Sequence, residues 1–318
     1  AVAPGQNPTR LDQYLTDMLR NASRNRIQKA IEMGNVLVNG KEAKRSRRIQ
    51  PGDEIYVKLL KPPPIELIPE DIGLNVVYED EWLMVVNKPP GMVTHPGFGN
   101  RHGTLVNAVL WHMGERDSIT LEGSEDEDDL GDFFKTESMK PGIIHRLDKN
   151  TSGLLVIAKE PQIQMKVAEQ FEQRTVEKMY YALVWGKFEQ DHGVITGDIG
   201  RSPRDRKLYA VVRKGGKPSM TEYFVEKRLH YVTLVRIKLH TGRTHQIRVH
   251  FKHIDRPIFG DPEYGGNAVV YGGYNTQWKS LCQNSLKKTN RQMLHAGVLG
   301  FEHPVKKEFM RFQSDIPK

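Results

Sequence analysis

The spacing of hydrophobic residues near the start of the chain predicts two short helices followed by a hairpin. Apolar residues recur at helical intervals across 10–19 and again after Ser23, which is the expected N-cap, while Gly34 suits the end of the second helix. The Asn39-Gly40 dipeptide tolerates the positive φ angles of a tight turn, and Pro51-Gly52-Asp53 predicts another turn. The strands that these turns separate are expected at 36–38 and 54–57.

The rest of the chain alternates short apolar runs with turn-forming residues and predicts a strand-rich domain. Strand-like stretches lie at 76–78, 83–87, 154–158, 180–186, 221–227 and 231–239. Helical spacing is confined mainly to 105–112 and 162–173. Strands with few helices between them favour an α+β fold, with a mixed, mostly antiparallel sheet in the larger domain and a small N-terminal α/β domain before it.

Composition divides the chain into two domains. Lys61-Pro62-Pro63-Pro64 is a stiff, proline-rich segment and therefore a predicted linker. We place the two domains at 10–58 and 74–318, with 59–73 as the linker between them. Two polar stretches are expected to form surface loops: the acidic 122–135 and the uncharged-to-basic 267–290.

Positive charge is concentrated in the first part of the chain. The formal net charge is +8, and residues 1–61 contain twelve Lys or Arg against six Asp or Glu, a local net of +6. Two basic clusters, on the second predicted helix and in the loop after the hairpin, include Arg24, Arg26, Lys29, Lys44, Arg45 and Arg47. Such a surface can follow RNA phosphates, and the alternative is a solvated charged face. Two clusters in one small domain favour RNA.

Several classes of protein are disfavoured by what the sequence lacks. The single cysteine, Cys282, excludes a disulfide within one chain and zinc sites of the CxxC kind. No apolar run approaches the ~18 residues needed to cross a bilayer. The segment AVAPGQNPTR shows no basic start followed by an apolar run, as a signal peptide would. We therefore expect a cytoplasmic protein.

Two segments carry residues that could perform chemistry. Pro141–Lys159 contains HRLDKNTSG just before a predicted strand, a position where catalytic side chains are often held; the alternative is a plain surface turn. Leu239–His253 contains four histidines, but neither the acidic or sulfur ligands nor the spacing of a helical zinc site, so no metal is expected there. Its Arg248 is a candidate for phosphate contact or for pairing with a carboxylate.

These segments resemble two known families. RLDQYL…SRNRIQKAIEMGNVLVNGK…PGDEI is similar to the S4 domain, a small RNA-binding module. The remainder resembles the pseudouridine synthases of the RluA/RluD type in six blocks: LMVVNKPPGMVTHPG (83–97), PGIIHRLDKNTSGLLVIAK (141–159), KMYYALVWG (178–186), TGRTHQIRVHF (241–251), IFGDPEYGG (258–266) and QMLHAGVLGFEHP (292–304). The resemblance implies isomerisation of uridine to pseudouridine in RNA. That reaction oxidises nothing and imports no group, so no cofactor is expected.

The resemblance also implies roles for individual residues. Asp148 matches the family's nucleophile, Arg248 the arginine that pairs with it, and Tyr180 the ring that stacks on uracil near a late proton transfer. The sequence leaves open whether Asp148 attacks ribose C1′, attacks C6 of the base or assists glycal formation. The candidates for base flipping and its pocket are Arg146, Ile247 and His145. If 247–248 belongs to a strand, Ile247 and Arg248 would point to opposite faces.

The substrate follows by analogy only. An S4-like domain beside an RluD-like catalytic domain points to large-subunit (23S) ribosomal RNA, free or in a pre-ribosomal large subunit. Transfer RNA is an alternative substrate, and a non-catalytic RNA-binding ribosome-assembly protein is an alternative function that would not need the trio of Asp148, Tyr180 and Arg248. A nuclease is disfavoured because the clustered carboxylates of two-metal chemistry are missing. A monomer is expected, since no coiled-coil heptads appear.

Overall fold

A computed structural model describes residues 1–19, 22, 24–59, 65–96, 100–121, 141–205 and 207–317. They form two compact units, which we describe separately: one is built mainly from Ala1–Leu67 and the other from most of the residues after Ile68. Three predicted features lie outside the described residues, namely the cap at Ser23, the proline-rich 61–64 and the acidic stretch 122–135. Among the described residues, no helix is both long and apolar enough to cross a membrane.

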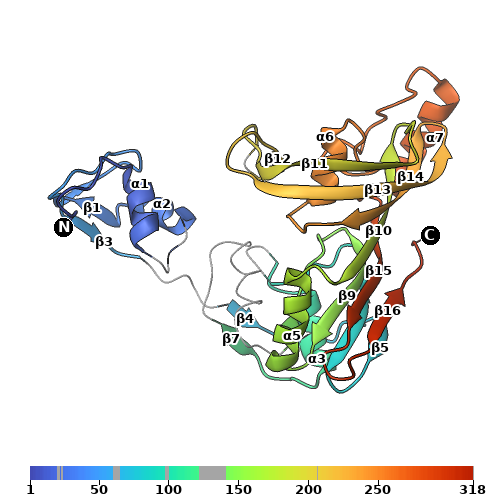
Figure 1. The fold of residues 1–318 in the computed structure, drawn as a ribbon, viewed down its shortest axis with the longest axis horizontal. Helices are drawn as coiled ribbons and strands as arrows, with labels where there is room; N and C mark the ends of the chain where they lie inside the picture. The colour runs from blue at the N-terminus through green and yellow to red at the C-terminus, as the bar shows by residue number, and fades with distance from the viewer. Residues whose placement is uncertain are drawn as a thin grey trace. The chain divides into compact units, whose positions relative to one another are not determined.

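The first unit folds as its hydrophobic pattern predicts. Helices α1 (Leu11–Met18) and α2 (Arg24–Glu32) share a core with a three-stranded antiparallel sheet of order β2-β1-β3 (Figure 1). The strands are β1 (Val36–Val38), β2 (Lys41–Glu42) and β3 (Ile55–Val57). Asn39 and Gly40 have φ angles of 53° and 74°, so the predicted hairpin turn is confirmed. A separate two-stranded antiparallel sheet pairs β4 (Ile65–Leu67) with β7 (Ile119–Leu121).

The second unit is organised around one large sheet (Figure 1). Its strands among the described residues are β5 (Val76–Glu79), β6 (Leu83–Lys88), β8 (Gly142–Ile143), β9 (Ser152–Ala158), β10 (Glu177–Trp185), β11 (His192–Arg201), β12 (Tyr209–Val211), β13 (Lys217–Leu229), β14 (Val232–Leu239), β15 (Leu294–Glu302) and β16 (Phe309–Gln313). The order is β12-β11-β13-β14-β10-β15-β9-β6-β5, with β16 on β15 and β8 on β9. Within the described part of the chain only β9 and β15 pair in parallel, which confirms the predicted α+β class with a mixed, mostly antiparallel sheet.

Strand β15 is where this sheet divides. One of its edges pairs with β10, while on the other its first residues meet β9 and Val298–Glu302 pairs with β16. The contact with β9 requires a glycine: Gly153 has φ 125°, and a Cβ atom there would lie 2.3 Å from the carbonyl oxygen of Ala296. The HRLDKNTSG segment therefore ends at the division of the sheet.

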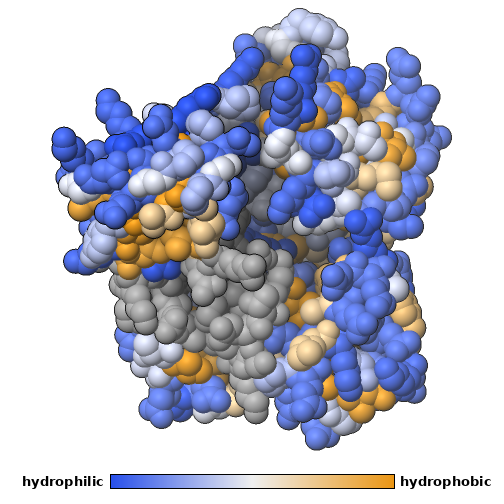
Figure 2. Space-filling model, turned by 60° about the vertical axis from the view of Figure 1, so that its left-hand side comes forward, coloured by the Kyte–Doolittle hydropathy of each residue, from blue (hydrophilic) through white to orange (hydrophobic). Residues whose placement is uncertain are grey.

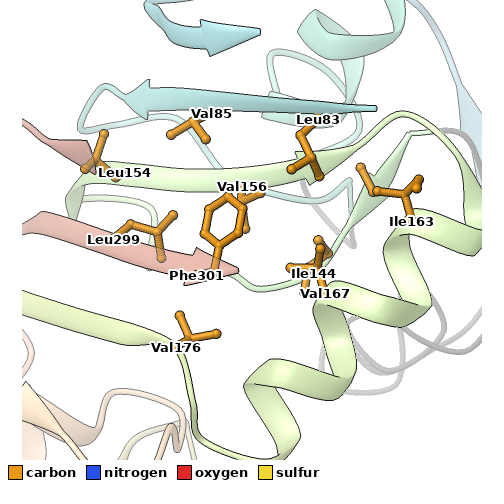
Figure 3. Close-up of a cluster of buried hydrophobic side chains, with 11 residues drawn as sticks. Leu83, Val85, Ile144, Leu154, Val156, Ile163, Val167, Val176, Leu299 and Phe301 are labelled. Carbon is orange, nitrogen blue, oxygen red and sulfur yellow. The ribbon is translucent and has the colours of Figure 1, made fainter. Parts of the chain in front are cut away.

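Helix α5 (Pro161–Glu172) covers part of the sheet around β9 and closes a hydrophobic core. Its buried Ile163 and Val167 belong to the same cluster as Val156 of β9 and Phe301 of β15 (Figure 3). Helix α3 (Leu105–His112) coincides with the predicted helix, and the side chain of Thr104 caps it. Figure 2 shows a mainly hydrophilic surface with smaller hydrophobic areas between the polar side chains.

Helix α7 (Thr276–Lys288) shows that the loop predicted over 267–290 was wrong for 276–288, whereas 267–275 does lack regular secondary structure. The side chain of Asn275 caps the helix by accepting the backbone N–H of Trp278 at 3.0 Å. Trp278 and Cys282 lie one turn apart and pack against β10 and β14. The polar overall composition of this stretch concealed its one-sided apolar pattern.

The sequence left open whether 247–248 belongs to a strand, and the structure places both residues in helix α6 (Gln246–His253). Residues 246–251 are all buried, so Ile247 and Arg248 do not divide between a buried and a solvent-facing side. Its polar members have their own partners instead: Arg248 donates to Asp261, and His250 Nδ1 lies 2.8 Å from Thr221 Oγ1. Polar and apolar side chains are therefore buried together in this helix.

Candidate active site

Asp148 lies in the loop between β8 and β9, with 21% of its side chain exposed. Hydrogen bonds fix the backbone of the loop on both sides of it. Thr151 N donates to the carbonyl oxygen of Asp148 at 3.0 Å, and Thr94 Oγ1 donates to that of Leu147 at 3.0 Å. The carboxylate is therefore accessible while its loop is held.

A buried ammonium group supports the same loop. Lys88, at the end of β6, is 1% exposed. It donates to the carbonyl oxygens of Pro89, Met92 and Lys149 at 2.9, 2.9 and 3.1 Å. Burial lowers the pKa of Lys88 to about 7, although the negative charge of Asp148 acts in the opposite direction. The NKPPGMVT segment thus contributes an anchor for the Asp148 loop.

The far end of the loop is tied to the strand that divides the sheet. Gln292 Nε2 donates to Thr151 Oγ1 at 3.3 Å, and Ser152 Oγ lies 3.0 Å from His295 Nδ1. His295 Nε2 in turn lies 2.8 Å from Ser314 Oγ. Burial lowers the pKa of His295, so the ring stays neutral and can share hydrogen bonds with both hydroxyl groups. The Thr and Ser of HRLDKNTSG are therefore structural partners of β15.

Arg248, in the first turn of α6, joins three carboxylates, and its side chain is only 4% exposed. Nη1 donates to Asp148 Oδ2 at 3.2 Å, while Nε and Nη2 donate to the two oxygens of Asp261 at 2.7 and 2.8 Å. Nη2 also donates to Glu263. Burial opposes the positive charge, but hydrogen bonding to Asp261 outweighs it and holds the pKa of Arg248 above its usual range. The guanidinium is thus a fixed, charged support for Asp148.

Asp261 is a site residue that sequence reasoning missed. It is fully buried in the turn after Gly260. Besides Arg248, its Oδ1 accepts the backbone N–H groups of Glu263 and Tyr264 at 3.0 and 3.2 Å. The signal that could have found it is the aspartate directly after Gly260 in IFGDPEYGG, a block that resembles the family, since a buried carboxylate needs a partner.

Tyr180 lies in β10 beside the site, where the pairing with β15 contains an irregularity between Met179 and Tyr180. Its residue surface is 9% exposed. Burial, and secondly the negative charge of Asp148, raises the pKa of Tyr180 above its ordinary value. The phenol therefore keeps its proton at neutral pH, within electrostatic reach of the carboxylate.

His245 is a second neighbour of Asp148 that the sequence did not assign. It precedes α6 in the left-handed conformation, with φ 55°, which is uncommon for a residue other than glycine and typical of functional sites. Its Nδ1 lies 2.8 Å from Tyr264 Oη, and its Nε2 lies 3.9 Å from Asp148 Oδ2. Since Tyr209 N already donates to that hydroxyl oxygen, we assign the ring hydrogen to Nε2. Burial lowers the pKa of His245, so the ring is neutral at neutral pH.

The three base-flipping candidates lie in different environments. Arg146 is exposed, two residues before the carboxylate. Ile247 is buried in α6, with 4% of its surface exposed. The ring of His145 stacks on Phe171 of α5 with a centroid distance of 4.6 Å, and its Nε2 accepts the backbone N–H of Val156 at 3.1 Å. Of the three, the structure leaves Arg146 at the surface and packs the other two against neighbouring elements.

The six predicted phosphate contacts lie in the first unit. Three of them form ion pairs: Arg24 with Asp12, Arg45 with Glu32 and Arg47 with Asp53, at nitrogen–oxygen distances of 3.0, 3.6 and 3.5 Å. Their side chains are still 36–50% exposed, so each keeps accessible donors. The other three are Arg26, which is half-buried, and Lys29 and Lys44, which are exposed.

The histidine-rich segment 239–253 provides hydrogen bonds at its described positions. His240 Nε2 lies 2.9 Å from Glu222 Oε2, and the partners of His245 and His250 are hydroxyl groups. Across the described ranges of the chain, no three His, Cys, Asp or Glu side chains are arranged to hold a metal ion. The chemistry that this geometry offers is that of an accessible carboxylate supported by a buried cation.

Comparison with known families gives two matches. Residues 82–253 match the family described as RNA pseudouridylate synthase, and residues 9–55 match the S4 domain. The first match contains Asp148, Tyr180 and Arg248. Asp261 and Glu263 lie just beyond it.

Individual relatives extend over most of the chain. A protein of Chlorobaculum parvum named "Uncharacterized RNA pseudouridine synthase" is 45% identical over 100% of this chain and 93% of its own length. The "Ribosomal large subunit pseudouridine synthase D" of Xanthomonas campestris pv. campestris is 36% identical over 97% of this chain and 86% of its own length. The solved structure titled "Human RNA Pseudouridylate Synthase Domain Containing 4" has a TM-score of 0.55 and 24% identity, covering 77% of this chain and 89% of that one, and is similar in fold.

Proposed function

This chain belongs to the RNA pseudouridylate synthase family and carries an S4 domain, and from that premise we propose that it converts specific uridines of large-subunit ribosomal RNA with Asp148 as the nucleophile. In this isomerisation the bond from uracil N1 to ribose C1′ breaks and a bond from C5 to C1′ forms. C5 loses a proton and N1 gains one, so atoms and electrons balance without an oxidant or an added group. The S4 domain, placed at 10–58, anchors the RNA, and the domain at 74–318 carries the reaction.

One observation carries the assignment of Asp148. Of the three carboxylates that receive hydrogen bonds from Arg248, Asp261 is fully buried and cannot reach a nucleotide. Glu263 lies in an exposed turn, with 47% of its side chain accessible. Asp148 combines access with a hydrogen-bonded loop and a fixed counterion, which orients the carboxylate for covalent engagement.

Tyr180 is proposed to stack on the uracil and to serve as a neutral hydrogen-bond partner. Its raised pKa keeps the phenol protonated, so it donates a hydrogen bond until a proton is exchanged late in the reaction. Ile247, which is buried in α6 of the same unit, is proposed to supply an apolar wall. These roles are consistent with a pocket in which the base is turned after the glycosidic bond breaks.

A uracil within folded RNA must leave its stack, at a cost of a few kcal/mol. Arg146 is proposed to occupy the vacated space, because it is exposed on the catalytic loop next to the nucleophile. Arg146→Ala should therefore lower kcat/KM more on a structured RNA than on an unstructured RNA with the same target sequence. Equal losses on both RNAs would refute the role.

The substrate class rests on two supports. Several relatives bear the name ribosomal large subunit pseudouridine synthase D, and they cover nearly the whole chain at 35–38% identity. The S4 domain gives a separate, basic RNA-binding unit suited to a large structured RNA. Transfer RNA is the alternative that the experiment below distinguishes.

The test is to incubate the purified protein with unmodified large-subunit ribosomal RNA, without metal or nucleotide, and to map pseudouridines chemically. The wild type should make site-specific pseudouridine, and Asp148→Asn should make none because the isosteric amide is not a nucleophile. Glu263→Gln is the matched control, since it removes a carboxylate from the same arginine and should keep most of the activity.

Each outcome decides a different point. Activity in Asp148→Asn would remove Asp148 from the nucleophile role, and loss of activity only in Glu263→Gln would transfer that role to Glu263. If the wild type modifies transfer RNA but not ribosomal RNA, the reaction stands and the substrate is corrected.

A further inference from the structure

Two turns bring together an aromatic cluster at the surface, which we call the aromatic platform: His230 and Tyr231 between β13 and β14, Tyr274 just before α7, and Trp278 in the first turn of α7. The ring of His230 stacks on Trp278 with a centroid distance of 5.9 Å and an interplanar angle of 23°. Tyr231 meets Tyr274 edge-on at 6.0 Å, and their hydroxyl oxygens lie 2.5 Å apart. Tyr274 is 84% exposed, so an aromatic ring is held in place at the surface rather than packed in the core.

The backbone is adapted to this cluster. Gly272 has φ 74°, and a Cβ atom there would lie 2.4 Å from the ring of Tyr231 and 2.7 Å from that of Trp278. Trp278 Nε1 donates to the carbonyl oxygen of Tyr271 at 3.2 Å. The platform is therefore preformed by the fold, which lowers the entropic cost of stacking another ring on it.

The charge of the surrounding segment is entirely positive. Between Glu263 and Glu302 the sequence contains four Lys or Arg and no Asp or Glu. Three of these, Lys279, Lys287 and Lys288, are exposed on α7. Such a surface complements a polyanion, and the combination of basic side chains with stacking rings is typical of surfaces that bind unpaired nucleotides.

The fourth basic residue links α7 to the site. Arg291, three residues after the helix, directs Nη1 to the carbonyl oxygen of Asn150 at 3.4 Å, in the loop of Asp148. A helix of thirteen residues is roughly 20 Å long, at 1.5 Å per residue. The exposed lysines of α7 therefore lie between the aromatic platform, at the start of the helix, and Arg291, which contacts the loop of Asp148.

We propose that the aromatic platform and the exposed lysines of α7 bind unpaired nucleotides of the substrate RNA outside the target uridine. This inference rests on the proposed function for its partner, an RNA, but assigns a second contact surface separate from the S4 domain. Bases stack on Tyr274 and His230, while Lys287 and Lys288 neutralise phosphates on the way to the catalytic loop.

The test measures affinity in the Asp148→Asn protein, so that binding is separated from turnover. The probes are an unmodified large-subunit ribosomal RNA transcript and a single-stranded oligouridylate. Tyr274→Leu, which removes the ring, should weaken binding of both about tenfold. Tyr274→Phe, which keeps the ring and loses only the hydroxyl contact, should lose less than threefold.

The lysines are tested by salt dependence. Lys287→Gln with Lys288→Gln should reduce the slope of log affinity against log salt by roughly 1.4–1.8, the value expected for two phosphate contacts. Lys166→Gln, an equally exposed lysine on α5, is the matched control and should leave the slope unchanged. Circular dichroism and thermal unfolding should show every variant folded, because the altered side chains lie at the surface.

The outcomes separate this inference from the proposed function. Wild-type affinity in Tyr274→Leu together with an unchanged salt slope in the double lysine variant would overturn the inference, as would a parent protein that binds neither RNA. If the variants lose binding but the wild-type enzyme makes no pseudouridine in the transcript, the RNA surface stands and the ribosomal substrate is withdrawn. If the variants lose a protein partner and no RNA affinity, the surface belongs to that partner and the inference is wrong.

Discussion

Replacing the buried Asp261 by asparagine should damage both stability and catalysis, although Asp261 cannot touch the substrate. Asn keeps the shape of the side chain and one accepting oxygen. That oxygen can still accept from Glu263 N and Tyr264 N, as Oδ1 does now at 3.0 and 3.2 Å. The new amide group then faces Arg248 Nε, where Oδ2 now accepts at 2.7 Å, and two donors oppose each other.

The stability cost can be worked from the geometry. Both side chains are buried, with 4% and 0% exposure, so the arginine cannot recover water when its partner loses its charge. Breaking one partner of a buried pair costs about 3–5 kcal/mol, and because Glu263 can still receive a hydrogen bond from the guanidinium we expect the lower end, about 3 kcal/mol. For a unit of this size the melting temperature should fall by about 6–12 °C.

The catalytic cost follows from the second function of the same arginine. If the guanidinium turns away from the amide, Nη1 no longer supports Asp148 at 3.2 Å. A displacement of about 1 Å can cost about a hundredfold in rate, so kcat should fall by about that factor while KM changes only a few-fold. Single-turnover pseudouridine formation measures the rate, and urea unfolding measures the stability.

A matched control separates the two effects. Asp80 also accepts several hydrogen bonds, including those from Tyr78 of β5 and the backbone N–H of Leu83 of β6. It pairs with His303 and Lys306 of the β15–β16 turn, both at 2.9 Å. None of these partners belongs to the Asp148 loop. Asp80→Asn should lower stability and leave kcat unchanged below the melting temperature. A normal kcat in Asp261→Asn with lowered stability would refute the positioning argument and leave only a structural role for Asp261.

Two further predictions concern stability. Gly153→Ala should lower the free energy of unfolding in urea by about 4 kcal/mol or more, because both the φ angle of 125° and the backbone of Ala296 exclude a side chain. Gly114→Ala, at φ 90° with open space around it, should lower it by only about 1–2 kcal/mol. Equal losses in the two variants would contradict the steric explanation. Burial, and secondly the charge of His253, lowers the pKa of His250 to about 4, whereas an unfolded histidine takes up a proton near pH 6.5. The unfolded state therefore binds more protons than the folded state between these two pH values. Acidification from pH 7 to pH 5 should lower the free energy of unfolding by about 1–2 kcal/mol more in the wild type than in His250→Gln. A wild-type protein with the same acid sensitivity as the variant would show that His250 titrates normally.

The sequence was a good guide where local patterns decide structure. The hairpin around Asn39-Gly40 and the helix at 105–112 are fixed by turn preference and helical spacing, and both were predicted correctly. The family was also found from sequence alone, through blocks such as HRLDKNTSG. The contact between Arg248 and Asp148 is present in the structure, while the catalytic roles of the pair stay predictions.

The errors arose where tertiary contacts decide. Helix α6 was not predicted, because its buried polar side chains have partners in distant segments that no local pattern reveals. In α7 the polar composition outweighed the spacing of Trp278 and Cys282. Asp261 and His245 could not be placed at the site from spacing alone, because only the completed fold brings them to Asp148.

The parallel contact between β9 and β15 also determines the order in which the molecule can be assembled. Ser152 and His295, which meet there, are 143 residues apart, so a long loop must close before the loop of Asp148 is anchored on this side. The hairpin and helices of the first unit are complete by Val57 and depend on contacts close in sequence. During synthesis from the N-terminus, the S4 domain can therefore fold first, and the loop of Asp148 is anchored on this side only after β15 has emerged from the ribosome.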